Sequence, residues 1–165
     1  MFLMPIMNWS SQSNMNTFSP IPSDDPIQEV IKQVFDMDLD IDGGWGYTQN
    51  DPLIPHTKTI STTQLQHTLA SMRTHLEMSM TQPAEQRYGG INLTELSREA
   101  KNNTDKVTYR VTAMLESDYA DFIAAYKEGY GTETFDMEAH FSARKKATIE
   151  RMVTVWFINP SNSYT

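Results

Sequence analysis

Cysteine is absent from this chain of 165 residues, and its absence excludes several kinds of chemistry at once. The protein has no disulfide bond, no thiolate nucleophile, no cysteine-ligated zinc and no iron–sulfur cluster. Basic residues are also scarce, since 13 Lys and Arg stand against 21 Asp and Glu and give a formal net charge of −8. Binding to a nucleic-acid backbone needs a concentrated basic surface, so we expect no nucleic-acid partner.

Long hydrophobic runs are missing as well. No apolar run approaches the ~18 residues of a transmembrane helix, so no membrane association is expected. Residues 1–22 contain no charged side chain and lack the basic start and apolar stretch of a secretory signal, which favours a cytoplasmic protein. This segment has no helical or strand period. We predict that residues 1–22 form a flexible N-terminal arm and that residues 23–165 form a single domain.

The first predicted helix follows the arm. Apolar residues recur at helical spacing from Ile27 to Phe35. Asp25 is a suitable N-cap, Pro26 suits the first helical position, and Gln28 stands where a capping-box side chain reaches back to the cap. We therefore predict a helix over 27–35 that Asp25 caps.

Three further helices are predicted along the chain. One begins at Ser61, with Gln64 at the capping-box position, and ends before Pro83. Another runs from Ser117 to about Glu128. Residues 135–146 fit either a helix or a strand, and we favour the helix.

Other segments alternate between apolar and polar residues, as strands with one wet face do. Residues 36–42 and 106–115 have this pattern. Residues 91–101 fit either a strand or a helix, since Asn92 with Glu95 also suits a helix start. We favour a strand that pairs with 106–115 through a turn at 102–105, because Asn and Asp favour turns. Residues 148–158 are apolar on both faces at their end, which predicts a central strand.

The order of these elements indicates the fold class. Helices and strands are mixed without a regular strand–helix alternation, which is typical of α+β proteins. We expect a single α+β domain with an antiparallel sheet of about four strands and three or four helices packed on one face.

Acidic residues concentrate in the first third of the chain. Residues 1–60 hold eight Asp and Glu against two lysines. Asp38, Asp40, Asp42 and Gly43 form a D-x-D-x-D-G string that resembles the first half of an EF-hand calcium loop. The twelfth position of that loop would be Gln49, which cannot supply a bidentate carboxylate. We therefore predict an exposed strand face with no metal, and keep a divalent-cation site as a third alternative.

A glycine-rich segment with two aromatic residues follows directly. Gly43, Gly44 and Gly46 surround Trp45, and Tyr47 comes next. One interpretation is a turn whose aromatic rings close one end of the core. The other is an exposed aromatic loop at a binding surface, since Trp and Tyr commonly anchor partners.

Candidate catalytic and basic residues are few. Glu138 and His140 are two residues apart and suit a general acid–base pair. No nucleophile elbow or P-loop motif occurs. A basic cluster is predicted to be a solvated surface or a helix end. Its members are Arg144, Lys145, Lys146 and Arg151.

We interpret the chain as a non-enzymatic protein-binding module with an acidic surface, and expect neither a cofactor nor a catalytic residue. The partner is predicted to be a basic protein, such as a toxin or nuclease that the chain neutralises. The alternative is a small hydrolase-type enzyme that uses Glu138 and His140. The predicted partner-binding residues are Asp38, Asp40, Asp42, Trp45, Tyr47 and Asp51.

Overall fold

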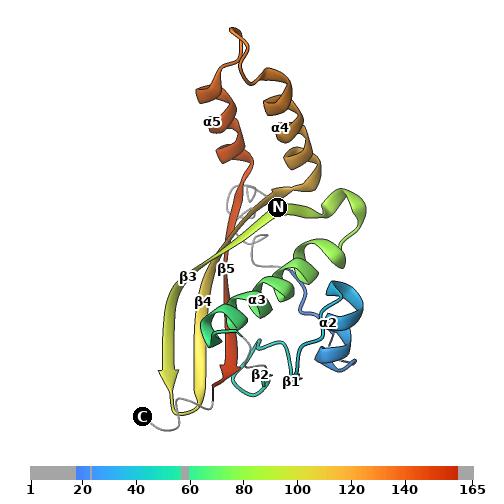
Figure 1. The fold of residues 1–165 in the computed structure, drawn as a ribbon, viewed down its shortest axis with the longest axis vertical. Helices are drawn as coiled ribbons and strands as arrows, with labels where there is room; N and C mark the ends of the chain where they lie inside the picture. The colour runs from blue at the N-terminus through green and yellow to red at the C-terminus, as the bar shows by residue number, and fades with distance from the viewer. Residues whose placement is uncertain (1–17, 23, 57–59, 160–165) are drawn as a thin grey trace, which may run out of the picture.

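The computed structural model describes residues 18–22, 24–56 and 60–159. The elements follow in the order α2 (Ile27–Phe35), β1 (Ile41–Gly43), β2 (Leu53–Pro55), α3 (Thr62–His75), η1 (Leu76–Met80), η2 (Ala84–Gln86), β3 (Tyr88–Lys101), β4 (Thr104–Leu115), α4 (Glu116–Gly129), α5 (Met137–Ala147) and β5 (Ile149–Ile158). The short element η1 is a π-helical turn and η2 is a 3₁₀ turn. The strands in the described part of the chain form one five-stranded sheet in the order β1-β2-β5-β4-β3, so the fold is α+β as expected (Figure 1).

Three long antiparallel strands make most of the sheet. β3 and β4 form a hairpin whose turn is closed by the pair Lys101↔Thr104, which confirms the predicted hairpin. Asn102 supplies the positive φ of its turn. β4 also pairs with β5 along its length, and β5 lies between β4 and β2, which confirms that 148–158 holds a central strand.

The other two strands are short, and they make the sheet mixed. β2 pairs with β5 in parallel at Leu53↔Phe157 and with β1 in antiparallel fashion. The sheet therefore has five strands and one parallel pairing, where the sequence predicted about four antiparallel strands. β2 was not predicted because three residues between Pro52 and His56 are too few to show an alternation.

Helix α2 has the predicted bounds but not the predicted cap. Ile27 and Ile31 are buried on its inner face. Pro26 occupies the N-cap position and no side chain caps the helix, so the prediction that Asp25 caps it is wrong. The amide of Gln28 does not reach back to the cap, because its Oε1 accepts a hydrogen bond from the backbone N–H of Ile41, 3.5 Å away.

Helix α3 begins as predicted, since the Ser61 hydroxyl accepts a hydrogen bond from the backbone N–H of Gln64 at 3.2 Å. The helical path continues through η1 to Met80 and ends before Pro83, as expected. Leu65 and Leu69 are buried with apolar side chains of β4 and β5, so α3 covers one face of the sheet. Among the described helices, none is long and apolar enough to cross a membrane.

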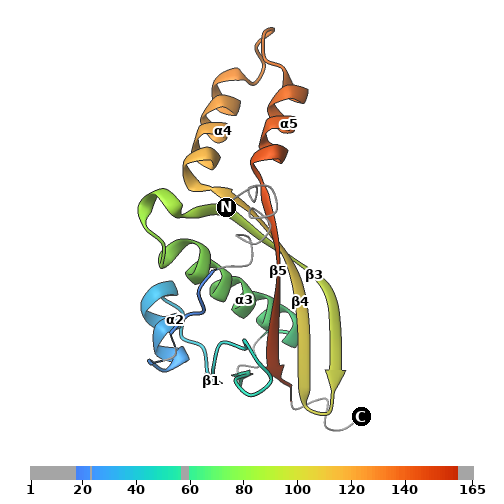
Figure 2. The same cartoon turned by 180° about the vertical axis from the view of Figure 1, so that it is seen from behind.

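Helices α4 and α5 confirm two predicted helices but lie elsewhere than expected. They form a hairpin between β4 and β5 that extends beyond the end of the sheet (Figures 1 and 2). No residue of α4 is buried, and His140 is the one buried residue of α5. The expectation that three or four helices pack on one face is therefore wrong for these two.

The described end of the predicted N-terminal arm contacts the domain. Phe18 and Ile21 pack against the core, and the Phe18 ring lies 5.7 Å from the ring of Tyr88. Residues 1–17 of that arm lie outside the described residues.

Candidate functional site

The acidic segment after α2 is extended but is a strand only at its end. Residues 36–40 carry no strand pairing, and β1 begins at Ile41, so the predicted strand over 36–42 is too long. Burial still alternates over residues 38–42, since Leu39 and Ile41 are buried while the three aspartates are exposed. These aspartates are Asp38, Asp40 and Asp42. Met37 was expected to be buried and is 39% exposed. The three carboxylates therefore share the solvent side of this segment.

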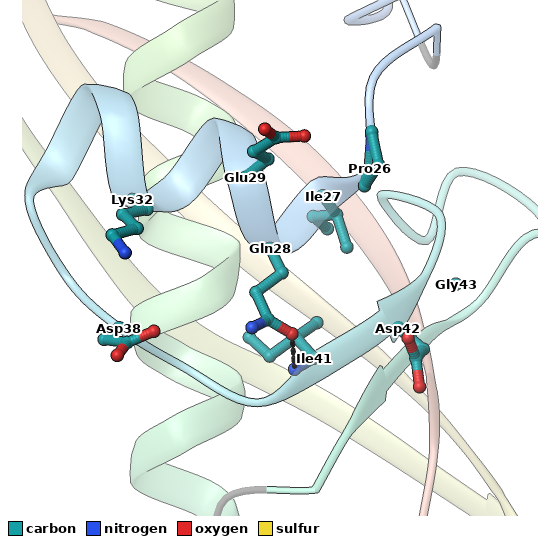
Figure 3. Close-up of a pocket in the computed structure, with 9 residues that line it drawn as sticks. All are labelled: Pro26, Ile27, Gln28, Glu29, Lys32, Asp38, Ile41, Asp42 and Gly43. Atoms are coloured by element: carbon teal, nitrogen blue, oxygen red, sulfur yellow. Dashed lines mark hydrogen bonds between the residues drawn. The ribbon is translucent and has the colours of Figure 1, made fainter.

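An open hollow of about 450 Å³ lies between α2 and this segment. Its lining includes three acidic residues, Glu29, Asp38 and Asp42, and one basic residue, Lys32. The carboxylates of Glu29 and Asp42 point in opposite directions in Figure 3. Figure 3 shows Glu29 and Lys32 on the helix, Asp38 below them, and the Gln28 amide reaching across to Ile41. The rest of the wall consists of Pro26, Ile27, Ile41 and Gly43.

One carboxylate of this hollow has a basic partner at its outer edge. The Nε2 atom of His56 lies 3.0 Å from Oδ2 of Asp42, and both side chains are substantially exposed. The backbone N–H of His56 also donates to the carbonyl of Asp40 at 2.8 Å. The segment is thus held at its end by β2 and the residue that follows it.

The geometry of this segment differs from a wrapped calcium loop. Asp42 and Gly43 pair with Ile54 and Leu53 of β2, so the backbone is extended where an EF-hand loop turns around its ion. Within the described ranges, no group of three His, Asp or Glu side chains is placed to hold a metal ion.

The aromatic residues of the glycine-rich segment do not form an exposed anchor. Trp45 is 2% exposed and belongs to the core. Tyr47 is half-buried, and its hydroxyl donates to Glu77 and accepts from the backbone N–H of Ile21 at 3.0 Å. The interpretation of an exposed aromatic anchor is therefore wrong for Trp45. The alternative, that the rings close one end of the core, is the arrangement found.

The glycines of this segment serve close packing. Gly46 has φ of +78°, and a Cβ there would lie 2.7 Å from the carbonyl oxygen of Trp156 in β5. A Cβ at Gly44 would lie 1.8 Å from Oδ1 of Asp51, so the side chain of Asp51 rests on the loop backbone and is half-buried. Asp51 was predicted to bind the partner, and it is not one of the residues that line the hollow.

A buried ionic cluster lies behind this loop, and sequence reasoning missed it. Glu77 is 2% exposed and binds two arginines: its Oε1 accepts from Arg151 at 2.9 Å and its Oε2 lies 3.4 Å from Nε of Arg73. Arg73 also donates to the carbonyls of Trp45 and Thr154 at 3.1 and 3.0 Å. The cluster thus ties α3, η1, β5 and the glycine-rich segment together.

Burial changes the acid–base behaviour of this cluster. Burial, followed by the hydrogen bond to the Glu77 carboxylate, raises the pKa of Tyr47 well above its ordinary value. Burial lowers the pKa of Arg73, and the neighbouring Glu77 carboxylate opposes that change. Since Arg73, Glu77 and Arg151 are at most 8% exposed, the cluster is closed to ligands and acts in stability.

A signal for half of this cluster exists in the sequence. Arg73 and Glu77 are four residues apart and continue the face marked by Leu65, Leu69 and Leu76, where charged residues are unexpected. Arg151 was predicted to belong to a solvated basic cluster and is 8% exposed instead. Its pairing with Glu77 spans 74 residues, and no local pattern predicts such a contact.

The candidate acid–base residues do not form a pair. His140 is buried among the rings of Phe122, Tyr126, Phe135 and Phe141, with ring centroids 5.1–5.8 Å away. Its Nε2 has no hydrogen-bond partner among the described residues. Glu138 is exposed on α5 and forms no hydrogen bond with His140 in that part of the chain. The geometry therefore gives no support to the hydrolase alternative.

Comparisons with protein-family models, with curated proteins and with solved structures found no match to this chain.

Proposed function

We propose that this chain is a protein-binding module whose acidic face binds a basic partner protein. The acidic face consists of Glu29, Asp38 and Asp42, which line the hollow of Figure 3, and of the exposed Asp40 between the two aspartates. Trp45 and Tyr47 have no part in it, because their rings are engaged in the core and in the buried cluster.

The observation that carries the proposal is the lining of the hollow. Three carboxylates against one lysine give it a negative potential, and a concave surface concentrates such a potential. Pro26 adds exposed apolar surface, and the buried side chains of Ile27 and Ile41 lie behind it. A Lys or Arg side chain fits this combination, because its aliphatic stem packs on apolar surface while its charged end meets carboxylates.

The favoured partner is therefore a protein with exposed Lys or Arg, such as a basic toxin or nuclease that the chain neutralises by covering its charged surface. Complementary charge speeds the encounter of two proteins and weakens as salt rises. Binding should accordingly be tightest at low ionic strength.

The test titrates the isotope-labelled chain with a short lysine-rich peptide and, separately, with a glutamate-rich peptide of equal length. We expect the lysine-rich peptide alone to shift the backbone NMR signals of residues 28–32 and 38–43. The triple variant Glu29→Gln, Asp38→Asn, Asp42→Asn should weaken binding by about 0.2–1 kcal/mol for each exposed charge pair that is lost.

A matched control removes three exposed carboxylates elsewhere and changes the net charge equally. This control variant is Glu85→Gln, Glu128→Gln, Glu133→Gln. It should bind the peptide as the wild type does. If both triple variants lose the same affinity, the chain attracts cations only through its overall charge, and the proposed acidic face is wrong.

A further inference from the structure

The hairpin of α4 and α5 extends beyond the end of the sheet opposite α2 and β1, and the base of α4 contacts β3 and β4 (Figures 1 and 2). It is therefore separate from the acidic face. Two helices of 14 and 11 residues bury few side chains by themselves, and His140 is the one buried residue that they contain. Short helices gain most of their stability from tertiary packing, so this pair benefits from a further packing surface.

One flank of the hairpin is apolar and exposed. Met137, Phe141 and Arg144 follow each other at four and three residues along α5 and so share one helical face. Met137 is 43% and Phe141 46% exposed. On α4 the ring of Tyr126 lies 5.9 Å from that of Phe141 and extends this surface. We call these four residues the α5 flank.

The composition of the α5 flank is that of a protein–protein interface. Tyr, Phe, Met and Arg are enriched at such interfaces. Tyr130 is 62% exposed, and its ring lies 5.2 Å from Tyr126, so the aromatic surface continues toward the tip of the hairpin. Solvent exposure of this much aromatic surface is unfavourable in the isolated chain.

Charges along α5 are arranged by sign. Asp136 and Glu138 lie at its start, Phe141 near its middle, and Arg144 and Lys145 near its end. None of these four charged side chains forms an ion pair within the described residues. Acidic residues at the start of a helix and basic residues at its end are also favoured by the helix dipole. The helix dipole explains the order of the charges, but it does not explain why apolar side chains between them are exposed.

We propose that the α5 flank binds the α5 flank of a second copy of this chain, with the two α5 helices antiparallel about a two-fold axis near Phe141. Glu138 and Lys145 are seven residues apart and lie on the same side of the helix. Reversing one helix against the other places Glu138 of each copy beside Lys145 of its mate. The interface is thus complementary to itself, as a two-fold interface must be.

The first measurement is the mass of the intact chain in solution by sedimentation equilibrium, over micromolar to submillimolar concentrations. We expect a concentration-dependent rise from the chain mass of 18.9 kDa toward twice that value. A mass that stays at one chain across this range overturns the proposal.

Charge reversal then identifies the contact. Glu138→Lys alone faces Lys145 with a like charge, and Lys145→Glu alone faces Glu138 with a like charge, so each variant should be monomeric. An equimolar mixture of the two should dimerise, because both contacts then join opposite charges. The double variant Glu138→Lys, Lys145→Glu should dimerise by itself.

The mixture of the two variants distinguishes a contact between two copies from an effect of each substitution within its own chain. Each variant carries the same internal change in the mixture as alone, so restored dimerisation requires contact between copies. Glu128→Lys and Lys101→Glu make equal charge changes at exposed positions off the flank and should leave the dimer intact. Circular dichroism should show native helix content in every variant. Dimers that survive both single reversals, or a mixture that remains monomeric, would show that the proposed contact is wrong.

Discussion

Glu77 is a carboxylate inside the core, and its two arginine partners come from distant parts of the chain. Arg73 lies one helical turn before it, and Arg151 lies on β5. Taking these three charges out of water is unfavourable, and their mutual contacts and hydrogen bonds to backbone carbonyls offset that loss. The cluster is therefore sensitive to the loss of any one member.

We predict that Glu77→Gln lowers the free energy of unfolding by about 3–5 kcal/mol, because it leaves two buried arginines without a counter-charge. Urea denaturation at neutral pH measures this change. Glu85→Gln, at an exposed glutamate of η2, is the control and should stay within about 0.5 kcal/mol of the wild type. A change below about 1 kcal/mol at Glu77 would mean that water reaches the arginines.

Tyr109 offers a second test at the residue scale. Its ring is 0% exposed, and its hydroxyl has no hydrogen-bond partner in the described part of the chain. Removing an unsatisfied buried hydroxyl is neutral or stabilising. Tyr109→Phe should therefore unfold at the same or a higher urea concentration than the wild type at neutral pH. Tyr47→Phe, which loses bonds to Glu77 and Ile21, should unfold at a lower one.

Tyr109→Phe should also change how the stability of the fold depends on alkaline pH. Burial raises the pKa of Tyr109 in the folded chain above the ordinary value of 10.0. Above about pH 10 the hydroxyl of Tyr109 ionises in the unfolded chain but stays protonated in the folded chain. The Tyr109 hydroxyl therefore lowers the free energy of unfolding by up to about 1.4 kcal/mol per pH unit. The stability advantage of Tyr109→Phe should grow between about pH 10 and about pH 11. An advantage that stays constant with pH would contradict the raised pKa.

The candidate site shows what single residues reveal before a structure is known. The exposure of Asp38, Asp40 and Asp42 was predictable, because alternation with apolar residues reports which side faces water. The burial of Trp45 was one of two open interpretations, since aromatic residues serve cores and interfaces alike. The link between Glu77 and Arg151 was not predictable, because the sheet alone brings these residues together.

At the scale of elements, the glycine-rich segment between β1 and β2 is positioned by β5. The backbone N–H of Trp156 donates to the carbonyl of Gly46 at 2.9 Å, so the loop backbone continues the hydrogen bonding of the sheet. This contact brings the loop close enough that no side chain fits at Gly46. Trp45, the residue before Gly46, is buried in the core next to this contact.

We predict that Gly46→Ala destabilises the fold much more than Gly131→Ala. Both positions have positive φ, which disfavours alanine by about 1–2 kcal/mol. The Cβ at Gly131 meets nothing within 4 Å, whereas the Cβ at Gly46 would overlap the backbone of β5 and add about 1–3 kcal/mol. Thermal unfolding of the two variants compares them directly. Equal losses of stability in the two variants would show that the positive φ alone, and not the contact with β5, determines the effect of each substitution.

Elements with a long and regular pattern were the predictable ones. Helices α2, α3 and α4 and strands β4 and β5 each carry several apolar residues at a constant spacing, and their bounds agree with expectation within a few residues. The three-residue strand β2 lacks such a pattern, and β1 takes up only the end of the alternating segment 36–42; both strands depend on tertiary pairing. The position of α4 and α5 depends on where β4 and β5 end, which no local spacing encodes.

At the scale of the whole molecule, the body and the hairpin have different packing. The body holds the buried cluster and the sheet core, from Ile31 of α2 to Val155 of β5. The hairpin packs mainly through half-exposed aromatic side chains. β4 and β5 are direct antiparallel neighbours up to Ala113↔Ile149, so the hairpin is an insertion at the end of a strand pair that is already complete.

We predict that the body folds without the hairpin. Replacing residues 116–146 with a two-residue Asn-Gly turn joins Leu115 to Ala147 in the register that the strand pair already has, and this turn suits the twist of paired antiparallel strands. The shortened chain should show cooperative unfolding, with a smaller dependence on urea because less surface becomes exposed. Hydrogen exchange should show protected amides in β4 and β5 at the level of the full chain. Loss of this protection would show that the hairpin stabilises the sheet, because helix and sheet would then unfold as one cooperative unit.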